Sequence, residues 1–259
     1  MTVAEQILQA KTDLDDVYAK GVEDGKAQGG NTEEAYQEGY TAGQKSEYDT
    51  FWDSFQNYGK RTNYSSAFFV GDAYNENGWT ESTFKPKYDI KPVGSINQML
   101  RGVYITDMVE HLKSLNVELD LSKATNFEYC FSYSTITHLG VIDFSSATVS
   151  MSRTFQGCSL LQTIDKIILS EATNQKGFLY AFDSCTALRE ISSIEGVINQ
   201  SIDVAIAPLN IETIRRIISA LKDYSGTSVV YTCCLGATNL AKLTDEEKAI
   251  ATEKGWTLA

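Results

Sequence analysis

The chain has 259 residues, of which 42% are hydrophobic and 22% are charged, a composition that is ordinary for a folded protein and argues against wholesale disorder. Its formal net charge of −12 would repel nucleic acid and anionic membrane surfaces, so neither is expected as a partner. No apolar run approaches the roughly 20 residues of a transmembrane helix, so we expect no membrane insertion, and the N-terminus predicts no signal peptide.

Residues 1–57 are predicted to form a helical stem. Apolar side chains in its first part alternate spacings of four and three, the pattern of a coiled-coil seam. These positions are Val3, Ile7, Ala10, Leu14 and Val17. A seam of only about two heptads is marginal in water, so it needs partner chains or the rest of the protein. We expect it to make a homo-oligomer, and the alternative is a helix that folds back on its own domain.

Residues 58–95 are expected to form an N-terminal cap. Aromatic side chains crowd the sequence between Phe51 and Tyr88. The favoured interpretation is that they close the N-terminal end of the region that follows. Stacking on sugar rings is the alternative, because aromatic faces offer a large contact area.

Residues 96–205 contain an internal repeat made of two blocks, preceded by a helix predicted from Thr106 to Leu115. The first block is Leu119–Thr125, and it recurs as Ile142–Thr148 and Ile167–Thr173. The second block places a phenylalanine three residues before a small side chain. Its phenylalanines are Phe131, Phe155 and Phe182, and the small residues are Ser134, Cys158 and Cys185. Repeats of this length are typical of stacked architectures.

Each repeat unit is expected to supply one short strand and one return segment. A single unit cannot bury its apolar face, so neighbouring units must stack to continue the core. The predicted fold class is therefore α+β, with a short leucine-rich-repeat-like β-solenoid that follows the helical stem. The unit around Ser193–Ile198 is degenerate, as a terminal repeat would be.

Residues 206–259 are predicted to be C-terminal capping helices and a strand. Asn210 is a helix N-cap before an apolar face, and Ser228–Cys234 reads as a strand. Thr244 opens a capping box for the last helix, which Gly255 ends. These elements would cover the open end of the repeats.

The sequence predicts no catalytic, cofactor-binding or metal-binding residue. It has two histidines, His111 and His138, and no phosphate-binding glycine loop, GxSxG or HExxH motif. Its five cysteines include no CxxC pair and are expected to be buried thiols. We therefore expect a binding or structural protein rather than an enzyme.

The outward side chains of the repeat strands are the predicted recognition surface. One row contains Glu118, Val141 and Lys166, and the next contains Asp120, Asp143 and Ile168. Asp120 and Asp143 occupy one column and could form a paired-carboxylate site if one pKa were raised. Ile168 breaks that column, so exposure to water is the favoured interpretation.

The repeats resemble those of the BspA-type leucine-rich-repeat proteins. The resemblance rests on Phe155–Cys158 with the apolar residues after it, and on Phe182–Cys185 with its own. Three further segments are similar to repeat proteins encoded in phages and prophages of gut bacteria. They are Tyr48–Asp53, Phe84–Ile90 and Ala251–Leu258.

The family resemblance implies adhesion or surface recognition without catalysis. Its phage branch implies a virion structural protein of the tail, baseplate or fibre, assembled in the host cytoplasm. The implied partners are other virion proteins and a host-surface protein or glycan. A bacterial cell-surface adhesin is the alternative, and a glycan hydrolase that uses Asp120 and Asp143 is a third.

Overall fold

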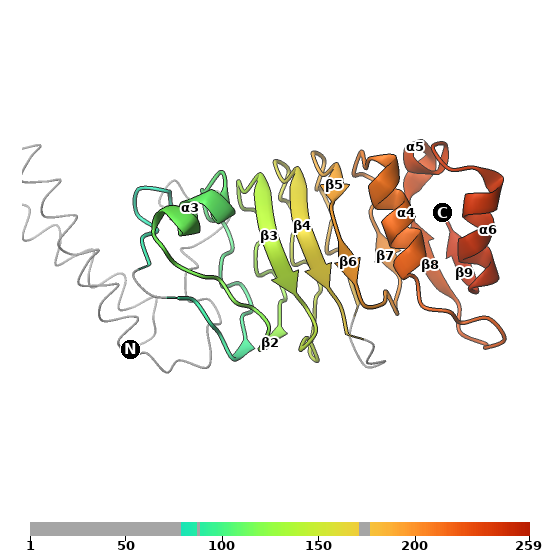
Figure 1. Ribbon diagram of the computed structural model, residues 1–259, viewed down its shortest axis with the longest axis horizontal. Helices are drawn as coiled ribbons and strands as arrows, with labels where there is room; N and C mark the ends of the chain where they lie inside the picture. Colours follow the sequence, from blue (N-terminus) through green and yellow to red (C-terminus); the bar gives the residue numbers. More distant parts are fainter. Residues whose placement is uncertain (1–78, 87–88, 171–176) are drawn as a thin grey trace, which may run out of the picture. The chain divides into compact units, whose positions relative to one another are not determined.

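The computed structural model describes residues 79–86, 89–170 and 177–259 (Figure 1). Residues 79–84 and 89–259, apart from the gap at 171–176, belong to one compact unit. The predicted stem and most of the predicted aromatic cap lie outside the described residues. So do all five positions of the predicted seam, Val3, Ile7, Ala10, Leu14 and Val17.

The unit contains three small sheets whose strands all pair in parallel. The first sheet pairs β1 (Gly94–Ser95) with β2 (Ala124–Asn126). The second contains β3 (His138–Asp143), β4 (Thr163–Ile168), β5 (Glu190–Ile191) and β6 (Ile194–Glu195). The third contains β7 (Ile202–Asp203), β8 (Tyr231–Cys234) and β9 (Trp256–Leu258). Figure 1 shows β3 and β4 side by side, with β5 and β6 next to β4.

The described residues form four helices. They are α3 (Met108–Ser114), α4 (Ile211–Ala220), α5 (Gly236–Leu240) and α6 (Asp245–Glu253). The three longer ones begin at side-chain caps: Asp107 before α3, Asn210 before α4 and the Thr244 capping box before α6. The predicted caps Asn210 and Thr244 are therefore confirmed. No helix in the described ranges is long and apolar enough to span a bilayer.

The predicted fold class, α+β with a leucine-rich-repeat-like β-solenoid, is wrong. The structure is mixed α/β, and within the described ranges no single sheet runs through the repeats. The second and third copies of the strand block pair as β3 and β4, whereas the first copy pairs with Ile90 through an isolated bridge at Leu119. Every short strand must satisfy its backbone groups with whichever neighbour lies closest. The last two residues of the first copy, Ala124 and Thr125, lie in β2, which pairs with β1 and does so with a register shift.

The aligned phenylalanines of the repeat nevertheless stack in the core. The ring centroids of Phe131 and Phe155 are 5.7 Å apart, and those of Phe155 and Phe182 are 5.3 Å apart. None of the three is more than 1% exposed. Stacked aromatic rings gain energy beyond the burial of their area, so this column holds successive repeat units together.

The small residues that follow the phenylalanines are also buried, and they bond to the unit before them. The Cys158 thiol donates to the Phe131 carbonyl at 3.0 Å, and the Cys185 thiol donates to the Phe155 carbonyl at 3.2 Å. Burial raises the pKa of the Cys158 thiol to about 11, which keeps it protonated and unreactive. The prediction of buried thiols is confirmed for four of the five cysteines, and Cys234 is half-buried.

Candidate functional site

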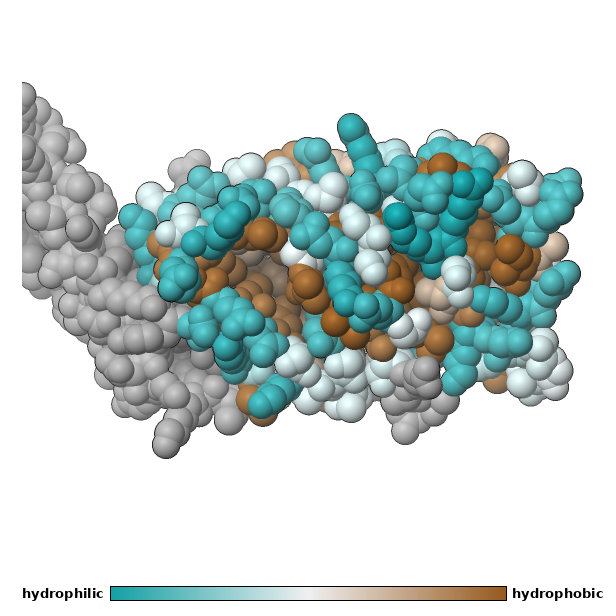
Figure 2. Space-filling model, in the orientation of Figure 1, coloured by the Kyte–Doolittle hydropathy of each residue, from teal (hydrophilic) through white to brown (hydrophobic). Residues whose placement is uncertain are grey.

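The structure brings only part of the predicted recognition surface onto neighbouring strands. Val141 lies opposite Lys166, and Asp143 lies opposite Ile168, in the β3–β4 pair. Glu118 and Asp120 lie outside that sheet, and their backbone groups bond to Ile90 instead. On the face shown in Figure 2, polar residues are interspersed with apolar ones.

Two charged members of the predicted recognition surface, Glu118 and Lys166, form ion pairs within the protein. Lys91 contacts Glu118 at 2.7 Å and Asp89 at 3.0 Å, and Lys166 contacts Glu195 at 2.5 Å. Exposed pairs of this kind add little to stability. Both lysines are engaged by carboxylates of the protein itself, which leaves them less available to a partner.

Asp120 and Asp143 form the same local turn rather than a shared acidic site. The Asp120 carboxylate accepts from the Ser122 N–H at 3.0 Å, and Asp143 accepts from the Ser145 N–H at 2.8 Å. Hydrogen bonds from Ser122 lower the pKa of Asp120. A paired-carboxylate hydrolase needs one carboxyl group with a raised pKa, so this arrangement does not favour the hydrolase alternative.

His138 is held between two carboxylates. Its Nδ1 lies 3.2 Å from Asp107 Oδ2, and its Nε2 lies 2.9 Å from Asp165 Oδ1. Burial by itself would lower the pKa of His138, but hydrogen bonds to Asp165 and Asp107 outweigh it and the pKa is raised. Both ring nitrogens are occupied, so the ring ties α3, β3 and β4 together and leaves neither nitrogen to activate a nucleophile.

We expect His138 to make folding stability depend on pH. Its pKa in the folded protein lies above the unfolded value, so its contribution is fully present below about pH 6.5 and is lost as pH rises through the folded-state pKa. Urea unfolding at a series of pH values should show a smaller loss across this range for His138→Gln than for the wild type. Asp165→Asn should also reduce the loss, because it removes one carboxylate. Identical profiles for all three proteins would contradict the assignment.

A second cluster, which we name the tyrosine–arginine row, lies on the return segments of the repeat. Its members are Arg101, Tyr129, Tyr133, Arg153 and Tyr180. The Arg101 guanidinium lies 5.3 Å from the Tyr129 ring centroid and 5.5 Å from that of Tyr133. The Arg153 guanidinium lies 5.4 Å from Tyr129 and 5.1 Å from Tyr180. Cations therefore alternate with rings from one repeat unit to the next.

Four of the five members of the row adopt a left-handed backbone conformation that bulky residues rarely use. The φ angles are +57° for Tyr129, +58° for Tyr133 and +55° for both Arg153 and Tyr180. Such a conformation costs about 1–2 kcal/mol per residue for a side chain with a Cβ. Glycine would avoid that cost, so the contacts that the large side chains make must offset the free energy lost in the backbone. Outliers of this kind concentrate at functional sites.

Gly157 makes room for one ring of the row. A Cβ added at Gly157 would lie 2.4 Å from Cδ1 of Tyr133, so the Tyr133 ring packs directly on this backbone. No residue of the row was predicted as a site from the sequence. A signal was nevertheless present, because Tyr129, Arg153 and Tyr180 each stand two residues before a stacked phenylalanine.

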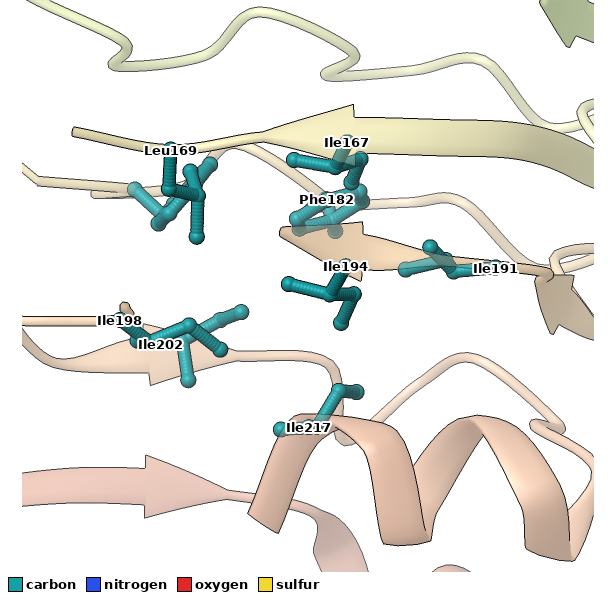
Figure 3. A pocket seen from close by; sticks show the side chains of 9 residues that line it. Ile167, Leu169, Phe182, Ile191, Ile194, Ile198, Ile202 and Ile217 are labelled. Carbon is teal, nitrogen blue, oxygen red and sulfur yellow. The ribbon is translucent and has the colours of Figure 1, made fainter. Parts of the chain in front are cut away.

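A small void between β4, β6 and α4 is lined only by apolar side chains (Figure 3). Ile167, Ile194 and Ile217 point into it from these three elements. Ligand pockets combine apolar walls with a few polar groups that orient the ligand. This void is therefore a gap in the packing of the core rather than a binding site.

The described part of the chain contains no cluster of three or more potential metal ligands. Comparison with known proteins finds no matching family model, no matching curated protein and no matching solved structure. The resemblance to BspA-type proteins therefore stays a prediction.

Proposed function

We propose that this chain is a non-enzymatic recognition protein and that the tyrosine–arginine row contacts its partner. The observation that carries the proposal is the left-handed backbone of Tyr129, Arg153 and Tyr180, which keeps large side chains where glycine would cost less. Tyrosine and arginine are among the residues that contribute most to binding energy at interfaces. The row offers both on a rigid frame, because the phenylalanine column fixes the units beneath it.

The proposed setting is a phage virion, on the resemblance stated above. There the partners would be other virion proteins and a host-surface protein or glycan, with residues 1–57 assembling a homo-oligomer. Mass spectrometry of purified phage particles tests the setting, and it should detect this chain at a fixed ratio to the major tail proteins. Detection on the bacterial surface without particles would favour the adhesin alternative.

We expect the row, rather than the strand face, to control binding to host cells. Labelled full-length Tyr180→Ala should bind about tenfold more weakly than the wild type, because truncating a tyrosine that contributes strongly to an interface costs more than about 1 kcal/mol. Val141→Asp changes an exposed residue of the strand face and is expected to leave binding unchanged. If Val141→Asp weakened binding and Tyr180→Ala did not, the recognition surface would be the strand face rather than the row. Equal thermal midpoints for the three proteins would show that both variants are folded.

A further inference from the structure

The row ends at its most exposed ring. Tyr180 is 50% exposed, and its neighbour Leu179 is 60% exposed. The Arg153 guanidinium stacks on Tyr180 from the preceding unit, and the backbone N–H of Arg153 donates to the Leu179 carbonyl at 3.0 Å. The guanidinium, the ring and an apolar side chain are thus held next to one another at the surface.

Arg153 is positioned to bind an anion. Tyr129 and Tyr180 come from the units before and after it, and the Arg153 guanidinium packs on both rings. A guanidinium only donates hydrogen bonds, and its forked geometry fits a carboxylate. Among the described residues, no carboxylate lies within ion-pair distance of Arg153. Acidic residues outnumber basic ones in this chain, 34 to 22, so an arginine without a carboxylate partner is unexpected.

The tyrosines beside Arg153 are suited to bind hydroxyl groups of a ligand rather than a second anion. The phenol of a tyrosine both donates and accepts hydrogen bonds. In the described ranges, neither Tyr129 nor Tyr180 uses its hydroxyl in a hydrogen bond within the protein. The row therefore offers hydroxyl, guanidinium and hydroxyl groups on three successive units.

The spacing of these groups distinguishes a glycan from a peptide. The Arg153 guanidinium lies 5.4 Å from the Tyr129 ring centroid and 5.1 Å from the Tyr180 ring centroid, whereas side chains on one side of an extended peptide repeat at about 6.6 Å. A peptide would fall out of step with the row after one pair of residues. A linear glycan advances by about one unit spacing per sugar ring, so successive rings stay in step. Extended peptides also need backbone partners, which a sheet edge supplies and a row of side chains does not.

We infer that the outer edge of Tyr129, Arg153 and Tyr180 binds a linear glycan that carries carboxylate groups, with one carboxylate on Arg153 and sugar hydroxyls on the two tyrosines. This inference rests on the proposed recognition function and names the chemical class of its ligand. The net charge of −12 repels an anionic ligand from the protein as a whole, so binding of the glycan is expected to depend on the local contact with Arg153.

The test uses the full chain and an oligomer of galacturonic acid, with its methyl ester as the matched neutral ligand. Calorimetric titration should show binding of the acid and at least about tenfold weaker binding of the ester, the loss expected for one charge-assisted pair. Arg153→Lys keeps the charge but loses the fork, so it should also weaken binding of the acid about tenfold. Lys166→Gln removes a positive charge from the strand face and should leave binding unchanged. Thermal unfolding establishes that both variants are folded.

Three results would overturn the inference. Equal binding of the acid and the ester would show that the site does not recognise a carboxylate. Equal binding of polyglutamate, with the same dependence on Arg153, would show that the partner is an acidic peptide. The third is no binding of the oligomer at millimolar concentration. If Tyr180→Ala still lost cell binding in that last case, the proposed recognition function would stand and only the ligand class would fall. If the oligomer bound but Tyr180→Ala had no effect on cell binding, the glycan site would stand and the proposed role of the row in cell binding would be wrong.

Discussion

Replacing Phe155 by alanine is expected to lower the free energy of unfolding by about 3–5 kcal/mol, the range for deleting a fully buried phenylalanine. Phe155 is 0% exposed and stacks between Phe131 and Phe182, with Phe144 at 6.3 Å against its edge. Alanine would leave a cavity at the middle of the column, where two repeat units meet. Urea unfolding followed by circular dichroism measures the loss.

Leu160→Ala is the matched control for this variant. Leu160 is 49% exposed and close to Phe155 in sequence, so its replacement should change stability by no more than about 0.5 kcal/mol. A Phe155→Ala loss as small as that of Leu160→Ala would mean that the column does not hold the units together.

Replacing Gly196 by alanine is expected to cost about 2–5 kcal/mol, the sum of a left-handed backbone and an overpacked contact. The φ angle of Gly196 is +82°, and an added Cβ would lie 2.1 Å from the Leu169 carbonyl oxygen. That oxygen belongs to backbone, which cannot rotate away as a side chain can. Either the chain after β6 or the end of β4 must therefore move, and both belong to the same sheet.

Gly226→Ala separates the two causes. Gly226 has a similar φ of +75°, but nothing lies within 4 Å of an added Cβ. Its replacement should cost only the backbone strain, about 1–2 kcal/mol. The difference between the two variants in urea unfolding measures the close approach to Leu169, and equal losses would contradict it.

Features that depend on neighbours along the chain could be predicted from the sequence. Asn210 and Thr244 cap their helices because each is followed by a residue whose N–H it can reach within one turn. The periodic phenylalanines likewise pointed to one column, since a residue that recurs at each repeat meets its own copies. The sheets were predicted wrongly because strand pairing is a choice among distant partners. Ile198, for example, bonds to Ala220 and Lys222 at the end of α4 rather than continuing the sheet of β6.

The tyrosine–arginine row was missed for a related reason. Turns with positive φ are recognised in sequences by glycine or asparagine, which adopt that conformation at low cost. Tyr129, Arg153 and Tyr180 occupy such positions without that signature, so the sequence does not reveal which way their side chains turn. The strand face was favoured instead because alternation along a strand can be read directly. Its charges then proved to be paired within the protein.

The in-register pairing of Ile142 with Ile167 has a genetic consequence. In-frame duplication of the codons for residues 142–166 would add a copy whose two ends already match the strands on either side. The same event would add a second copy of Phe155 to the phenylalanine column and would place a second arginine beside Arg153 with no ring between the two. Recombination would thus lengthen the column by one ring in a single step, while the helices that close the fold stayed as they are.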